Sequence, residues 1–223
     1  MFKHEIKGAE KLLKLRGENV LFVSNHQTYF ADVSFFLIVI HSAFNNRLNK
    51  LSSWGPFNPK KHNIYYIAAE ETMKSGLLPK LMALSGAVTV QRSWRANGEN
   101  VRRKVSKTDA KNIDMAIQDG WVITFPQGTT SPYAQGRIGT SIMIKNHEPI
   151  VVPIVIDGFR RSFDKKGLKT KKRRSTLKMT IKDPLDIDYS KTAEEILSQV
   201  MEAIEQSPGH NFMERVNKKE ATE

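Results

Sequence analysis

The chain has 223 residues, a net charge of +12 and no cysteine. This length suits one substantial hydrophobic core, so we expect a single domain over residues 1–223. The lack of cysteine excludes disulfides, thiolate metal sites and a cysteine nucleophile. The positive charge favours anionic partners such as nucleic acid, anionic lipid, coenzyme A or an acidic carrier protein. Residues 1–20 have no apolar core typical of a signal peptide, and the apolar run over residues 33–40 is shorter than the about 20 residues that span a bilayer. We therefore expect a protein that stays in solution or lies on a membrane surface.

Short apolar runs alternate with helical patterns along the chain. The six expected strands cover residues 20–23, 64–69, 87–90, 121–125, 150–156 and 178–181. The expected helices cover residues 32–44, 70–85, 102–119 and 193–205. This alternation predicts an α/β fold with a mostly parallel central sheet and helices on both faces.

Polar turns follow three of the expected strands. Asn25-His26 follows the first strand, Arg92 the third, and residues 126–129 the fourth. In sheets of this kind, ligands bind at the carboxyl ends of the strands, so these turns predict a site at one edge of the sheet.

His26 and Asp32 lie where the first strand gives way to the first helix. Imidazole, with an ordinary pKa of about 6.5, is suited to accepting a proton from a hydroxyl near neutral pH. A neighbouring carboxylate would fix the tautomer of the ring and stabilise the imidazolium. A lone histidine followed by an aspartate is also typical of a packing histidine and a helix cap, so the pair has to be judged with its surroundings.

Four short blocks follow one another along the chain: Ser24-Asn25-His26 through Asp32, Gly86 to Arg92, Phe125 to Ser131, and Val152-Pro153-Ile154. In this order they resemble the blocks of the glycerolipid acyltransferases related to 1-acylglycerol-3-phosphate acyltransferase. The likeness covers roughly residues 8–205 and implies the α/β fold of that family.

The resemblance implies that His26 is the general base and Asp32 its partner. It implies that Arg92 contacts a phosphate of the acceptor, that the third block lines the acceptor pocket, and that Pro153 shapes the donor side. Arginine offers a planar fork of donors to phosphate, and Gly128 would allow close approach of a free backbone N–H to a developing oxyanion. The substrate-binding residues that we expect are Asn25, Arg92, Gln127, Gly128, Thr129, Thr130, Arg137 and Pro153.

Two departures from the family pattern concern the site. Five residues, 27–31, separate His26 from Asp32 where four are usual. Asp32 can serve only if the turn before the helix takes up the extra residue, because six positions of a continuous helix place two side chains about 240° apart. Gln127 stands where glutamate is usual, and Thr130 stands where arginine is frequent. Arg95 or Arg137 would replace the anion contact that is lost with this arginine.

Residues 160–174 contain nine basic residues and one acidic residue, with Phe163 and Leu168 among them. Beside a membrane, such a segment is attracted to anionic lipid by about 1 kcal/mol per basic residue, although a solvated loop has the same composition. Further candidates for membrane contact are residues 35–38, Trp54 and Phe57.

We expect a flexible tail over residues 207–223.

The expected function is O-acyl transfer from a thioester to the free hydroxyl of a lysophospholipid, which turns 1-acylglycerol-3-phosphate into phosphatidic acid in lipid biosynthesis. The thioester of coenzyme A or acyl carrier protein is a co-substrate, and no further cofactor or metal is expected, since the histidines lack ligand spacing. We expect a cytoplasmic protein held peripherally at the inner face of the membrane.

Three alternatives remain open. A lyso-aminolipid acceptor would explain Gln127 and Thr130, and the same departures leave room for an inactive lipid-binding relative. A basic RNA-binding module would explain the charge, but the aromatic residues fall mostly inside apolar runs and no specific nucleic-acid signature is present. A serine hydrolase is disfavoured by the absence of a glycine-x-serine-x-glycine motif.

Overall fold

A computed structural model describes residues 2–15, 17, 19–51, 63–74, 84–91, 106–172 and 174–211. Arg92, Arg95, Trp54, Phe57 and most of the expected tail lie outside these residues, so the predictions made for them are not addressed by the structure. None of the helices in the described ranges combines the length and the apolar character that crossing a bilayer requires.

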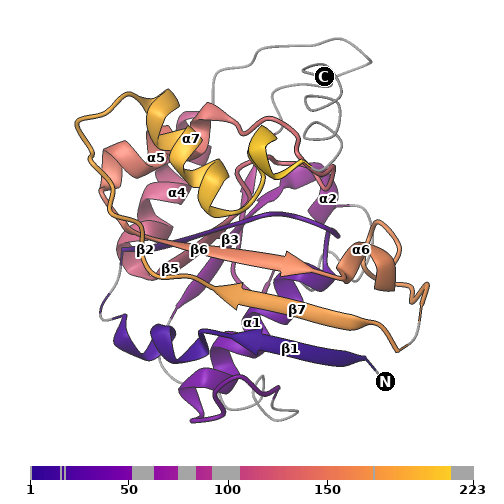
Figure 1. The fold of residues 1–223 in the computed structure, drawn as a ribbon. Coiled ribbons are helices and arrows are strands. Elements are labelled where there is room, and N and C mark those ends of the chain that lie inside the picture. The colour runs from indigo at the N-terminus through magenta and orange to yellow at the C-terminus, as the bar shows by residue number, and fades with distance from the viewer. Residues whose placement is uncertain are drawn as a thin grey trace, which may run out of the picture.

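Seven strands form one sheet in the order β1-β7-β6-β2-β5-β3-β4 (Figure 1). All neighbouring strands run parallel except β6 and β7, which are antiparallel. The predicted mostly parallel sheet is therefore confirmed. The strands are β1 (Lys3–Lys7), β2 (Val20–Ser24), β3 (Ile64–Ala69), β4 (Ala87–Val90), β5 (Trp121–Thr124), β6 (Ile150–Asp157) and β7 (Thr176–Ile181).

Helices cover both faces of the sheet, as predicted (Figure 1). The 3-10 helix η1 (Ala9–Lys14) and α1 (Ala31–Phe44) pack on one face. The helices on the other face are α4 (Lys107–Asp119), α5 (Ile138–His147) and α7 (Ala193–Ala203). The short helices α2 (Glu70–Met73) and α6 (Phe159–Ser162) follow β3 and β6, and the 3-10 helix η3 (Pro208–His210) follows α7.

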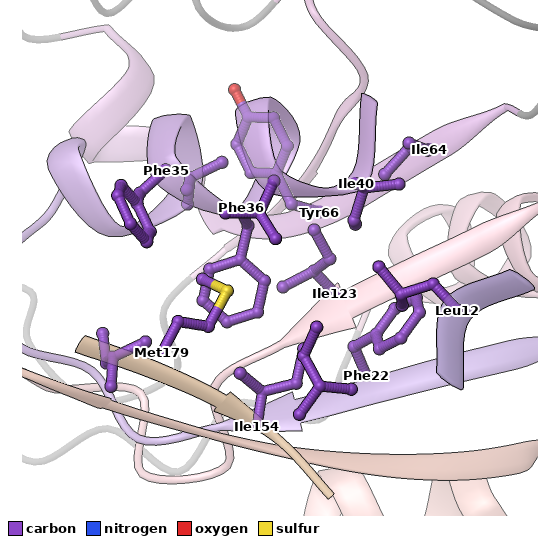
Figure 2. Packing of buried hydrophobic residues seen from close by; sticks show 14 of the residues in the cluster. Leu12, Phe22, Phe35, Phe36, Ile40, Ile64, Tyr66, Ile123, Ile154 and Met179 are labelled. Atoms are coloured by element: carbon purple, nitrogen blue, oxygen red, sulfur yellow. The ribbon is translucent and has the colours of Figure 1, made fainter. Parts of the chain in front are cut away.

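The central strands are buried on both sides, which explains why they read as continuous apolar runs. In β2, Phe22 packs under α1 while Leu21 and Val23 face the opposite cluster. Phe36 of α1 points toward the sheet among the labelled core residues of Figure 2. Phe36 is fully buried and Phe35 nearly so, and the hypothesis that these two side chains contact a membrane is therefore wrong.

Five elements of the described residues were not predicted. β1 has a single buried side chain, Ile6, and its other residues are lysine, histidine and glutamate, a composition that protects an exposed edge strand from aggregation. The helices η1, α5, α6 and η3 were also not predicted. Of the expected helix over residues 70–85, α2 covers Glu70–Met73 and residues 84–85 form part of a turn, while residues 75–83 lie outside the described residues.

Candidate active site

The polar turns after β2 and β5 lie side by side at the carboxyl edge of the sheet. The two strands are parallel neighbours, with Val23 opposite Thr124. The ring of His26 consequently stacks on that of Phe125, with 4.1 Å between centroids and 24° between planes. Two of the three predicted polar turns thus meet, and the third, at Arg92, falls outside the described residues.

His26 and Asp32 are hydrogen-bonded despite the extra residue between them. Nδ1 of His26 lies 2.9 Å from Oδ2 of Asp32. His26 precedes the helix and Asp32 is its second residue, because α1 begins only at Ala31. The turn over residues 27–30 therefore takes up the extra residue, which was the condition that the sequence set for this pair.

Three further donors hold the Asp32 carboxylate, which is fully buried. Oδ2 accepts the backbone N–H groups of Gln27 at 2.6 Å and Thr28 at 3.0 Å, and Oδ1 accepts the Thr28 hydroxyl at 2.7 Å. The N-terminus of α1 adds a favourable dipole for the negative charge. Because an ionised carboxylate only accepts hydrogen bonds, Nδ1 of His26 carries the hydrogen and Nε2 of the neutral ring is the basic atom.

Asn25 extends the pairing of β2 with β6 by one residue. Its Nδ2 donates to the carbonyl of Ile156 at 2.9 Å, and its Oδ1 accepts the Ile156 N–H at 2.8 Å. Both ends of the amide are engaged, so the side chain fixes the position of the backbone that carries His26. Its predicted contact with substrate stays a prediction.

The turn after β5 differs from the expected oxyanion site. The N–H of Gly128 donates to the carbonyl of Phe125 at 2.9 Å, so this amide closes a turn and is not free for an oxyanion. Gly128 has φ +59°, and a β-carbon there would lie 2.8 Å from the guanidinium carbon of Arg137. The positive φ favours glycine at this position, whereas the flexible end of the Arg137 side chain could move to admit a β-carbon.

The other residues of the third block make structural contacts. Nε2 of the buried Gln127 donates to the carbonyl of Ala134 at 2.9 Å and to Oε1 of Gln206 at 3.3 Å, which ties this loop to the end of α7. The carbonyl of the buried Thr130 accepts the guanidinium of Arg160.

A cavity of about 110 Å³ opens beside His26. Its polar wall includes Gly128 and Arg137, the two residues from the predicted substrate-binding set that the structure brings to it. Asn25, Gln127, Thr129, Thr130 and Pro153 do not line it, and Pro153 lies within β6 opposite Val23. The remaining lining residues are mostly apolar: Tyr29, Val33, Tyr66, Ile67, Ala68, Ala69, Thr72, Met73, Val90, Thr124 and Phe125.

Sequence reasoning missed the wall that β3 and α2 contribute, which includes Tyr66 and Met73. The missing information was the strand order, since β3 reaches His26 only because it lies beside β5. Tyr29 could have been found, because it lies inside the turn between His26 and Asp32. Within the described ranges, no three histidine or acidic side chains are grouped to hold a metal ion.

A hairpin, residues 163–170, lies within the basic segment and is well ordered by its own hydrogen bonds. Phe163 and Thr170 form an antiparallel bridge. Asp164 closes the turn, because its Oδ1 accepts the N–H groups of Leu168 at 2.8 Å and Lys169 at 2.9 Å. We call this element the basic hairpin.

Acid is expected to loosen the basic hairpin. Backbone N–H groups, that of Lys169 first, hold the pKa of Asp164 below its ordinary value of 3.8. A depressed pKa gives stability that is complete above the ordinary value and lost as the pH falls through the folded-state pKa. Hydrogen-exchange protection of the Leu168 and Lys169 amides should fall in this acid range, and the fall should be absent from an Asp164→Asn variant. The same acid loss of protection in that variant would contradict this assignment.

The model of a family described as "Acyltransferase" matches residues 3–157. The crystal structure of the 1-acyl-sn-glycerophosphate (LPA) acyltransferase PlsC from Thermotoga maritima matches with a TM-score of 0.58 and 19% identity, over 91% of this chain and 69% of that chain. At this identity the likeness concerns the fold. A search of curated proteins gave no match.

Proposed function

Because this chain belongs to the acyltransferase family, we propose that it moves a fatty acyl group from a thioester to the free hydroxyl of a lysophospholipid. Membership of the family makes the chain an acyltransferase enzyme, which argues against the RNA-binding module. The assay described below separates an active enzyme from an inactive lipid-binding relative. The observation that carries the proposal is the hydrogen bond from His26 to the buried Asp32 at the wall of the cavity.

His26 would act as the general base on the acceptor hydroxyl. Nε2 takes the hydroxyl proton as the oxygen forms a bond to the thioester carbonyl carbon, and Asp32 stabilises the imidazolium that results. When the tetrahedral intermediate collapses, the carbon–sulfur bond breaks and the imidazolium returns the proton to the departing sulfur. No protein nucleophile is needed, which agrees with a chain that has no cysteine.

The cavity suits an acyl group beside an anionic headgroup. Its apolar side, formed by residues such as Val33, Tyr66 and Met73, would hold the first carbons of the acyl chain. Arg137 brings a positive charge to the same cavity, which favours a phosphate on the acceptor. We therefore favour 1-acylglycerol-3-phosphate as acceptor and phosphatidic acid as product. The printed name of the Thermotoga maritima relative describes the same acceptor class.

A lyso-aminolipid acceptor is the second candidate. Its support is the sequence, in which the neutral Gln127 and Thr130 stand where glutamate and arginine are usual. Neither side chain lines the cavity beside His26, which is why it ranks second. An assay of the purified protein should therefore offer palmitoyl-coenzyme A or palmitoyl carrier protein with either lysophosphatidic acid or a lyso-aminolipid, and detect lipid products by mass spectrometry. We expect phosphatidic acid as the dominant product. Product from the lyso-aminolipid alone would favour the second candidate, and no product from either would contradict the proposed function.

The basic hairpin is the proposed membrane contact. Lys165, Lys166 and Lys169 are exposed on it, together with Leu168, whose side chain is 43% exposed. Lysines around an exposed leucine suit an anionic bilayer, because the charges attract the headgroups while the leucine enters the interface. We propose that this surface holds the protein at the cytoplasmic, inner face of the membrane.

Replacing Lys165, Lys166 and Lys169 together with glutamine should weaken binding to anionic vesicles by about 10²-fold, since each basic residue contributes about 1 kcal/mol. Vesicle co-sedimentation measures this directly. The matched control replaces Lys107, Lys111 and Lys191, which are also exposed but lie on α4 and before α7. Equal losses in the two triple variants would show that only net charge matters and would contradict the assignment of the surface.

A further inference from the structure

The basic hairpin packs against the turn that carries the histidine–aspartate pair. The N–H of Tyr29 donates to the carbonyl of Lys165 at 3.1 Å, and the N–H of Phe30 donates to the carbonyl of Lys166 at 3.0 Å. Both amides belong to the turn that takes up the extra residue between His26 and Asp32. That turn therefore depends on carbonyl groups far along the chain for two of its hydrogen bonds.

Gly167 is the point of closest approach between the two turns. Its φ is +78°, and a β-carbon there would lie 2.6 Å from the backbone nitrogen of Ala31 and 2.8 Å from the hydroxyl oxygen of Thr28. Real β-carbons do not approach other atoms so closely, so any side chain would force one of the turns to move. The Thr28 hydroxyl is the group that donates to Oδ1 of Asp32.

The base of the hairpin packs on aromatic side chains. Phe163 packs on Phe2 with 4.9 Å between ring centroids and on the buried Phe159 with 6.3 Å. Phe159 begins α6, which directly follows the central strand β6. Because the base of the hairpin is anchored in this way, crowding at Gly167 would press on Thr28 and Ala31.

We propose that the basic hairpin positions the histidine–aspartate pair, with Gly167 as the positioning residue. A side chain at this position would push on Thr28 and Ala31, loosen the hold on the Asp32 carboxylate, and so change the alignment of His26. The kinetic part of this inference rests on the proposed acyl transfer, whereas the positional part concerns a hydrogen bond that can be observed without substrate.

The test compares Gly167→Ala with Gly17→Ala. Gly17 has nearly the same backbone conformation, φ +80°, but no atom of the described residues lies within 4 Å of a β-carbon placed there. Both variants thus carry the same backbone strain, and only one crowds the turn. For Gly167→Ala we expect kcat to fall at least about 10-fold with KM within about twofold, because a small misalignment of a catalytic group is costly. Gly17→Ala should keep kcat within about twofold of the wild type.

The second readout is the proton NMR resonance of the Nδ1–H of His26, assigned by its loss in His26→Ala. It should shift or broaden in Gly167→Ala and stay in place in Gly17→Ala. If Gly167→Ala does not fold, Gly167→Asn replaces it, because asparagine tolerates positive φ but still carries the β-carbon.

Equal kcat values and an unmoved resonance in the Gly167 and Gly17 variants would overturn the proposal. A resonance that moves only in the Gly167 variant, in a protein that shows no transfer with any acceptor, would uphold the positioning role and reject the proposed function. The two failures are therefore distinguishable.

Discussion

Replacement of His26 with alanine is expected to lower kcat for acyl transfer by about 10²–10⁴-fold, the usual contribution of a general base. The hydroxyl of the acceptor would then have no group to take its proton as it attacks the thioester. The fold should survive, because His26 lies in a turn at the edge of the sheet and its side chain contributes no backbone hydrogen bond. Initial rates of thiol release, with thermal unfolding followed in parallel, measure both effects.

His147 offers a matched control on the opposite side of the sheet. Its Nε2 lies 2.9 Å from Oδ1 of Asp114, and its side chain is 15% exposed against 12% for His26. His147→Ala therefore removes a similar histidine–aspartate contact away from the cavity and should leave kcat within about twofold. If both alanine variants kept wild-type rates, His26 would not be the base and the mechanism would be wrong.

Substitutions of Asp32 should separate stability from catalysis. Asp32→Ala removes a buried acceptor that four groups share. These groups are the N–H of Gln27, the N–H and the hydroxyl of Thr28, and the ring of His26. The free energy of unfolding should fall by about 3–5 kcal/mol, because several donors lose their acceptor and each buried unsatisfied group costs about 1–3 kcal/mol. Denaturant unfolding measures this change.

Asp32→Asn keeps the size of the side chain but removes the charge that stabilises the imidazolium. We expect a smaller loss of stability than for alanine, and a fall in kcat on the order of 10²–10⁴-fold. Asp114→Ala is the comparison, because its side chain is 49% exposed and exposed pairs contribute only about 0–1 kcal/mol. Wild-type kcat in Asp32→Asn would contradict the orienting role of this carboxylate.

The central strands could be predicted because burial on both faces gives them uninterrupted apolar runs, as in residues 121–124 and 150–156. β1 could not, because an edge strand exposes its side chains and its lysines and glutamate look like loop. The helix α5 was missed for a related reason: its buried residues include Thr140 and Ser141, which weaken any apolar stripe.

At the site, the sequence identified His26 and Asp32 but not how they could meet. The answer depends on Lys165 and Lys166, whose carbonyl groups bind the turn from a distant part of the chain. The sequence also could not show the role of the Gly128 amide. The same residues are compatible with an N–H that closes a turn and with an N–H that is free to bind a ligand. The wall of the cavity that β3 and α2 form depends on the strand order, and no local sequence pattern encodes the strand order.

The most direct test of the account is thiol release by the wild-type protein from palmitoyl-coenzyme A, or palmitoyl carrier protein, with and without lysophosphatidic acid. Direct attack by the acceptor hydroxyl predicts that release requires the acceptor and matches the phosphatidic acid formed mole for mole, while the mass of the protein stays unchanged. Thiol release without acceptor, accompanied by an acylated protein, would contradict direct attack by a hydroxyl that His26 activates.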